Sequence, residues 1–335
     1  MRLDFIRPLY ERQEPYASVY LAGLSGPERL RRWRSLSGEL ADADPRAVEV
    51  LEKAVTDTGR ARAMFASGDE LVMAETLPKA AEQALWAPLP HVTPMLRERG
   101  ENVPHLRVIV DHAGAELTVF GGGSPRRSTV EATSWPLQKT AQGGWSQRHY
   151  ERGVEEAWER NATSAARGVD EQVRRIGAEL VIVAGEPRSR SMLCDHLGTK
   201  ASDRVLMVEH GSRRDHGGFE RDAETALDSW LERRRSELIG RYHQSAGPTG
   251  FEEVAHVLRE GRAEAVLLPG ELSHSVWIGP GGTQLARTPD ELRRWGVESS
   301  TTDRADSALA RAAAMTDAEF WFCDELDQVA ALLRY

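Results

Sequence analysis

The chain has 335 residues, 40% of them hydrophobic and 28% charged, and its formal net charge is -9 at pH 7. This composition is that of a globular protein and excludes fibrous and disordered chains. A negative chain is repelled by phosphate, so indiscriminate nucleic-acid binding is excluded while docking through local basic patches is not. No segment approaches the roughly 20 apolar residues of a membrane helix, and the charged amino terminus is unlike a signal peptide, so we expect a cytoplasmic protein.

The first 104 residues predict an α/β domain. A strand is indicated at 15–23 by its aromatic and β-branched residues, and 61–77 reads as a β-hairpin around a Ser-Gly-Asp turn. Two amphipathic helices are expected between them, at 27–40 and 45–58. Their core-facing residues are expected to be Leu30, Trp33, Leu40, Val48, Leu51 and Val55.

Residues 105–220 predict a middle domain with the element order βββαβαβ. Two apolar runs at 106–123 are joined by a short turn, and 128–135 is a possible third strand. A loop without periodicity at 136–146 then leads into a long helix. This long helix is expected at 150–176, and the strand, helix and strand that follow it at 179–186, 192–197 and 204–211.

Residues 221–335 alternate helices and strands, which favours a third domain of αβα type. The expected elements are a charged helix at 221–242, a helix and strand within 251–271, a Gly-rich hairpin at 276–285, and a helix and strand within 307–323.

Only two cysteines occur, Cys194 and Cys323, and neither has a second Cys or a His at ligand spacing. Neither a disulfide framework nor a zinc site is indicated. We expect two buried, reduced thiols, no bound metal and no cofactor.

The most specific motif lies between the strands and the long helix of the middle domain. It reads Gln142-Gly143-Gly144-Trp145-Ser146-Gln147-Arg148. With the three-domain order, it resembles the bacterial branch of the archaeal/eukaryotic class-1 peptide release factor superfamily. That superfamily includes Pelota, the hibernation factor Balon and the quality-control peptidyl-tRNA hydrolases.

The resemblance implies a fold and a partner. The middle domain would be ribonuclease-H-like, and the third would be similar to kink-turn-binding ribosomal proteins. The protein would bind the A site of the 70S ribosome, with its first domain towards the decoding centre and residues 143–148 towards the peptidyl-transferase centre. By similarity to Balon, it would act in ribosome hibernation or the stress response, with elongation factor Tu as a possible delivery partner.

The residue types of this segment suit contact with RNA. Paired glycines permit close backbone approach. Gln147 cannot act as a general base, but its amide can orient water or stabilise an oxyanion in peptidyl-tRNA hydrolysis, the enzymatic alternative. Trp145 can stack on an unpaired base. The remaining candidate RNA-binding residues are Gly143, Gly144, Ser146, Arg148, Lys139 and Arg152.

The motif departs from the superfamily pattern in its spacing. Gln directly follows the two glycines in release factors, and one Ser intervenes in the quality-control hydrolases, whereas Trp145 and Ser146 both intervene here. One extra residue displaces Gln147 by roughly 3.3 to 3.6 Å if the segment is extended, which disfavours catalysis. We therefore expect binding without hydrolysis. Alternatively, the glycines are a linker and Ser146 caps the following helix.

A nuclease is the rival from another class. Three carboxylates each follow an apolar strand of the middle domain, where such groups can hold divalent ions for phosphodiester cleavage. They are Asp111, Glu186 and Glu209. Carboxylates are also common turn residues, which is the simpler interpretation.

Two further loops carry residues typical of binding sites. His210 and His216 flank a loop whose arginines disfavour a bound cation, so we interpret it as a link to the third domain. Gly279 to Gly282 lack the Lys-Ser/Thr of a phosphate-binding loop and predict a hairpin turn.

Overall fold

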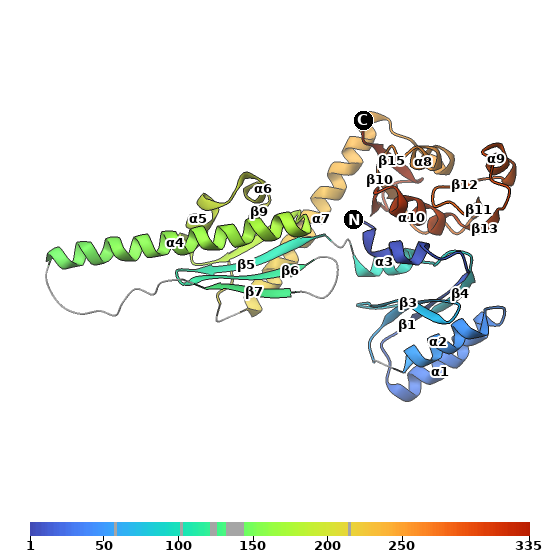
Figure 1. The fold of residues 1–335 in the computed structure, drawn as a ribbon, viewed down its shortest axis with the longest axis horizontal. Coiled ribbons are helices and arrows are strands. Elements are labelled where there is room, and N and C mark those ends of the chain that lie inside the picture. Colours follow the sequence, from blue (N-terminus) through green and yellow to red (C-terminus); the bar gives the residue numbers. More distant parts are fainter. Residues whose placement is uncertain (57–58, 101–102, 121–125, 132–143, 214–215) are drawn as a thin grey trace. The chain divides into compact units, whose positions relative to one another are not determined.

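The computed structural model describes residues 1–56, 59–100, 103–120, 126–131, 144–213 and 216–335, with the backbone alone for 131 and 144–154. The chain forms two compact units. Unit 1 combines residues 1–102 with 235–335, and unit 2 comprises 103–234. The expected α/β class is confirmed, since helices alternate with several sheets (Figure 1).

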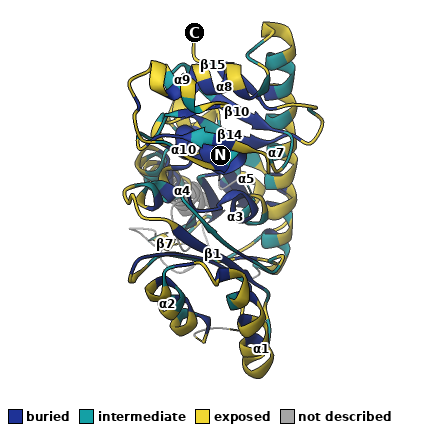
Figure 2. Cartoon of the chain, turned by 90° about the vertical axis from the view of Figure 1, so that its right-hand side faces the viewer, coloured by how far each residue is buried: buried dark blue, intermediate teal, exposed yellow. Residues whose placement is uncertain are grey.

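The amino-terminal part of unit 1 is built on an antiparallel sheet with the strand order β3-β2-β1-β4. All six residues of the central strand β1 are buried, and it is drawn in dark blue in Figure 2. This continuous burial follows from apolar cores on both faces of the sheet. The elements are the 3-10 helices η1 (Asp4–Tyr10) and η2 (Ser37–Leu40), the α-helices α1 (Gly26–Leu36), α2 (Pro45–Val55) and α3 (Thr93–Arg99), and the strands β1 (Tyr16–Leu21), β2 (Arg62–Ser67), β3 (Glu70–Thr76) and β4 (Gln83–Ala87).

The carboxyl-terminal part of unit 1 contains two three-stranded sheets, β14-β10-β15 and β12-β11-β13. The predicted hairpin is confirmed, because β11 and β12 pair antiparallel around the Gly-rich turn. The elements are α8 (Gly250–Arg259), β10 (Ala263–Leu268), β11 (Ser275–Ile278), β12 (Leu285–Ala286), α9 (Pro289–Arg294), β13 (Thr301–Arg304), α10 (Ala305–Met315), β14 (Glu319–Phe322) and β15 (Ala330–Leu333).

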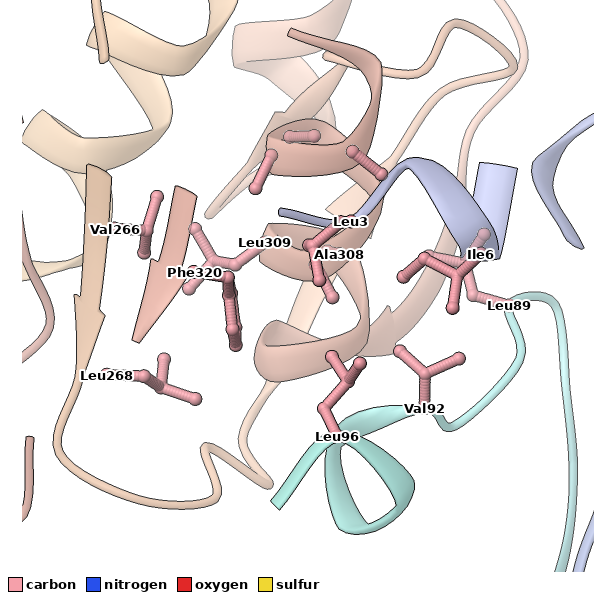
Figure 3. Packing of buried hydrophobic residues seen from close by; sticks show 14 of the residues in the cluster. Leu3, Ile6, Leu89, Val92, Leu96, Val266, Leu268, Ala308, Leu309 and Phe320 are labelled. Carbon is pink, nitrogen blue, oxygen red and sulfur yellow. The ribbon is translucent and has the colours of Figure 1, made fainter. Parts of the chain in front are cut away.

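One apolar core joins the two parts of unit 1. Ile6 of η1 and Leu96 of α3 belong to the same cluster as Leu309 of α10 and Phe320 of β14, part of which is drawn in Figure 3. Residues 1–102 therefore share a core with the end of the chain.

Unit 2 is a five-stranded sheet with helices on both faces. Its strand order is β7-β6-β5-β8-β9, with the β5, β6 and β7 pairs antiparallel and β5, β8 and β9 parallel. Alternate β8 residues face two cores, Val181 and Val183 towards α4 and Ile182 towards α7. The elements are β5 (His105–Asp111), β6 (Gly114–Phe120), β7 (Arg126–Glu131), α4 (Gly144–Ile176), β8 (Leu180–Gly185), α5 (Pro187–His196), α6 (Thr199–Ser202), β9 (Val205–Met207) and α7 (Gly217–Ser245), which continues into unit 1.

The predicted elements in the middle of the chain occur in the expected order, with the short helix α6 in addition. Two details differ from expectation. Leu30 is 38% exposed, and Arg29 occupies the buried position of α1 instead. Arg29 is accommodated there because Nε donates to the Val55 carbonyl (2.6 Å) and Nη1 to the Arg60 carbonyl (2.8 Å). Cys323 is buried as expected, whereas Cys194 in α5 is only partly buried.

No helix among the described residues combines the length and the apolar character needed to cross a bilayer.

Candidate functional site at the amino-terminal end of helix α4

The predicted motif lies at the start of the longest helix of unit 2. Gly144 begins α4, which is 33 residues long, and residues 145–148 form its first turn. The expectation of a loop is wrong for this part, because nothing between Trp145 and Arg152 breaks a helix. Arg152 lies about two turns further along α4, while Lys139 and Gly143 fall outside the described residues.

The start of α4 stands well away from the sheet. Figure 1 shows α4 continuing past the ends of the strands of unit 2. Among its described side chains, the first buried one is Ala157. At 1.5 Å per residue, Gly144 lies about 20 Å along the helix from that point. The motif therefore lies at the amino-terminal end of α4, beyond the ends of the strands of unit 2.

The carboxyl-terminal half of α4 packs on the sheet through small and β-branched residues. Ala165, Val169 and Val173 are buried at helical spacing against β5 and β6. Where α4 leaves the sheet, the buried Asn161 donates from Nδ2 to the carbonyl of His112 (3.0 Å), directly after β5.

An aromatic and ionic contact braces α4 at the same edge. The guanidinium of Arg188, from the first turn of α5, lies 5.0 Å from the centre of the Trp158 ring. Arg188 also forms an ion pair with Glu155 of α4 (2.7 Å). Sequence analysis missed Asn161 and Arg188 as positioning residues. The sequence could have indicated Asn161, since it is a polar residue beside the apolar positions of the helix.

A known family covers this part of the chain. Residues 104–248 match the family model described as bacterial archaeo-eukaryotic release factor family 2. This segment is therefore similar to the bacterial archaeo-eukaryotic release factors.

Two relatives align with the whole length of the chain. The uncharacterized proteins Rv2629 (strain ATCC 25618 / H37Rv) and MT2704 (strain CDC 1551 / Oshkosh) of Mycobacterium tuberculosis are each 29% identical over 365 residues, which cover 100% of this chain and 97% of theirs.

Solved structures with similarity include release factors and Pelota proteins. The archaeal termination factor aRF1 matches with a TM-score of 0.27 and 12% identity over 98% of this chain and 96% of its own. A ribosome-bound archaeal Pelota with ABCE1 matches with a TM-score of 0.38 and 14% identity over 99% and 94%. Archaeoglobus fulgidus Pelota matches with a TM-score of 0.30 and 11% identity over 99% and 92%.

The matched segment also contains the carboxylates of the nuclease alternative. Asp111 and Glu186 follow the parallel strands β5 and β8, so they lie at the same edge of the sheet. The Asp111 carboxylate accepts from the Ala113 amide (2.8 Å) and pairs with Arg213 (3.3 Å). Glu186 lies 3.8 Å from the imidazole of His112.

The third carboxylate, Glu209, is exposed, next to His210. His210 contributes its backbone amide and its Nδ1 to the carboxylate of Asp222 (both 3.0 Å), and these hydrogen bonds lower the pKa of Asp222. Among the described residues, no group of three or more His, Cys, Asp or Glu side chains is arranged to hold a metal ion. The described sheet edge therefore gives the nuclease no support.

Proposed function

We propose that this release factor-like protein is a ribosome-associated translation factor that binds the A site and directs the start of α4 towards the peptidyl-transferase centre. The observation that supports this most is the placement of the Gly144–Arg148 segment at the far end of a long helix, within the part that matches the family model. Its resemblance to hibernation factors favours idle or stressed ribosomes as the target.

The start of a helix suits contact with RNA phosphates. The first four backbone N–H groups of an α-helix have no intrahelical partner, and the helix dipole places partial positive charge there. Both features favour phosphate oxygens. Arg148 and Arg152 add two cations at this end, whereas the whole chain carries a net charge of -9. Ribosome binding is therefore expected to be local to this end of the middle unit.

The proposal includes the three-domain organisation 1–104, 105–220 and 221–335, with a ribonuclease-H-like middle domain. Its support is that residues 1–102 and 235–335 have separate sheets within unit 1, and that the sheet of unit 2 combines three antiparallel with two parallel strands. The first domain would face the decoding centre, and the third would engage a partner such as elongation factor Tu.

Co-sedimentation with 70S ribosomes tests the proposal, using vacant and tRNA-loaded particles at low and moderate salt. We expect saturable binding that weakens with salt through counterion release. Arg148→Ala should lower the affinity several-fold and reduce the slope of log K against log salt by about 0.7 to 0.9, the loss of one phosphate contact.

The matched control is Arg167→Ala, which removes an exposed arginine from the part of α4 that lies along the sheet. It should leave both the affinity and the salt slope unchanged. Equal losses for the two variants would contradict a specific role for the start of α4. Absence of binding to either ribosome preparation would remove the ribosome from the function of this protein.

The same preparation separates binding from hydrolysis. Gln147 lies in the first turn of α4. We expect wild-type protein and Gln147→Ala to release no peptide from tRNA-loaded ribosomes above the rate without protein. Release that disappears in Gln147→Ala would establish the peptidyl-tRNA hydrolase alternative instead.

A further inference from the structure

Unit 1 contains a pocket outside the part that matches the family model. Its volume is about 370 Å³, which lies in the range of small-molecule sites. The walls come from five segments of unit 1: the end of η1 with the start of β1, the residues after β4, the turn between β11 and β12, the start of β13, and α10.

Three side chains that line this pocket bury donors that lack an acceptor. They are the hydroxyls of Tyr10 and Tyr16 and the Nε of Arg311, none of which has a hydrogen-bond partner in the described part of the chain. Tyr16 is 1% exposed and Arg311 is 6% exposed. Buried polar groups are rarely left unsatisfied in native proteins, so the three point to an acceptor supplied from outside the chain.

The guanidinium of Arg311 places a positive charge beneath the pocket. Its Nη1 and Nη2 donate to the carbonyls of Gly279 (3.1 Å) and Gln284 (3.2 Å), which fixes its orientation. Within the residues that the structure describes, Arg311 forms no ion pair. The nearby Asp303 accepts instead from the amides of Leu89 (2.7 Å) and Arg304 (2.6 Å), and burial raises its pKa to about 6.

The glycine-rich turn is shaped to the pocket. A Cβ at Gly282 would lie 2.6 Å from Cγ of Met315 in α10, and one at Gly279 would lie 2.7 Å from Cγ1 of Val297. The turn thus packs closely against Met315 and Val297, and an added Cβ would require these side chains to shift. Leu9, Leu89 and Met315 add apolar surface to the same pocket. The combination suits a ligand with an apolar body and a head that accepts hydrogen bonds.

We propose that this pocket binds a small organic anion, whose phosphate or carboxylate group accepts hydrogen bonds from Arg311, Tyr10 and Tyr16. The site is separate from the start of α4, and its existence does not depend on ribosome binding.

Thermal unfolding of the full chain tests this inference with three probes: inorganic phosphate, adenosine monophosphate and citrate. We expect at least one probe at millimolar concentration to raise the Tm, because a ligand that binds only the folded state stabilises it. A rise with the phosphates alone identifies a phosphate site, and a rise with citrate alone identifies a carboxylate site.

Tyr16→Phe and Tyr10→Phe remove only hydroxyls that have no internal partner. Neither should lower the Tm without ligand, while each should weaken probe binding roughly tenfold or more, as for loss of a hydrogen bond to a charged group. These isosteric variants avoid the folding defect that loss of Arg311 would cause.

The matched control is Tyr20→Phe. The Tyr20 hydroxyl donates to the His91 carbonyl (2.5 Å) and accepts from the Met95 amide (3.2 Å), so its removal should lower the Tm and leave probe affinity unchanged. The inference is overturned if no probe raises the Tm, or if the rise is equally large in the wild type, Tyr16→Phe and Tyr10→Phe.

Discussion

His105, the first residue of β5, is held in its neutral form. Its Nδ1 donates to the Val103 carbonyl (2.9 Å), and its Nε2 accepts from Nε of Arg107 (3.4 Å). The ring stacks on Phe120 at 4.5 Å. Burial, with a smaller contribution from the adjacent Arg107, lowers the pKa of His105 to about 4. A proton on this ring would break the contact with Arg107.

Lowering the pH should therefore reduce the stability of unit 2 through protonation of His105. Its pKa is about 6.5 when unfolded and about 4 when folded, so between these values the unfolded chain binds more protons and stability falls as the pH falls. From pH 7 to 4.5, we expect His105→Gln to lose less unfolding free energy than the wild type, by on the order of 2 kcal/mol. Urea unfolding at both pH values measures the difference, and equal losses would refute it.

At the scale of elements, the β2–β3 hairpin depends on one glycine. Ser67 pairs with Glu70, so Gly68 and Asp69 form a two-residue turn, and Gly68 has a φ of +57°. Only glycine adopts this backbone conformation without strain.

Gly68→Ala should destabilise unit 1 by about 1 to 2 kcal/mol, the strain of a left-handed conformation at a residue with a Cβ. Gly38→Ala is the control, because a Cβ there meets no atom within 4 Å. Thermal unfolding should show a lower Tm for Gly68→Ala and an unchanged or slightly higher Tm for Gly38→Ala. A normal Tm for Gly68→Ala would show that the turn relaxes.

Elements with strong periodicity could be predicted from the sequence. The hairpin, the strands β5, β6 and β8 and the body of α4 are where the pattern placed them. Among the elements that were not predicted are β4 and α3. β4 is only five residues long, and α3 begins beside Pro94, which suits the first turn of a helix although it also suggested a loop.

The candidate sites differ in how far the sequence could reveal them. The motif at the start of α4 is contiguous and was found, but its helical conformation was not, because glycine pairs favour a loop by propensity alone. The ligand pocket could not be found, since Tyr10, Tyr16 and Arg311 converge only through the tertiary fold. Arg29 was overlooked because a charged residue is assigned to the surface unless its partners are known.

At the scale of the whole molecule, the two units have their own cores and are expected to unfold in two transitions. Val183→Ala empties a fully buried position of unit 2, and Val266→Ala does the same in unit 1. Each substitution should cost about 2 kcal/mol and lower only one of the two transition temperatures. Calorimetry of both variants is the test, and a single transition shifted equally by both would show that the units unfold together.

The shared core of unit 1 has a consequence for synthesis. Residues 1–102 emerge from the ribosome first, yet part of the core that holds Ile6 and Leu96, including Leu309 and Phe320, lies beyond residue 234. At roughly 5 to 20 residues per second, the nascent chain waits on the order of ten seconds or more before those partners appear. Unit 2 meanwhile has its whole sequence available. Chaperones that bind nascent apolar segments are therefore expected to engage the amino-terminal segment, and translation pausing within residues 103–234 should lower the yield of folded protein.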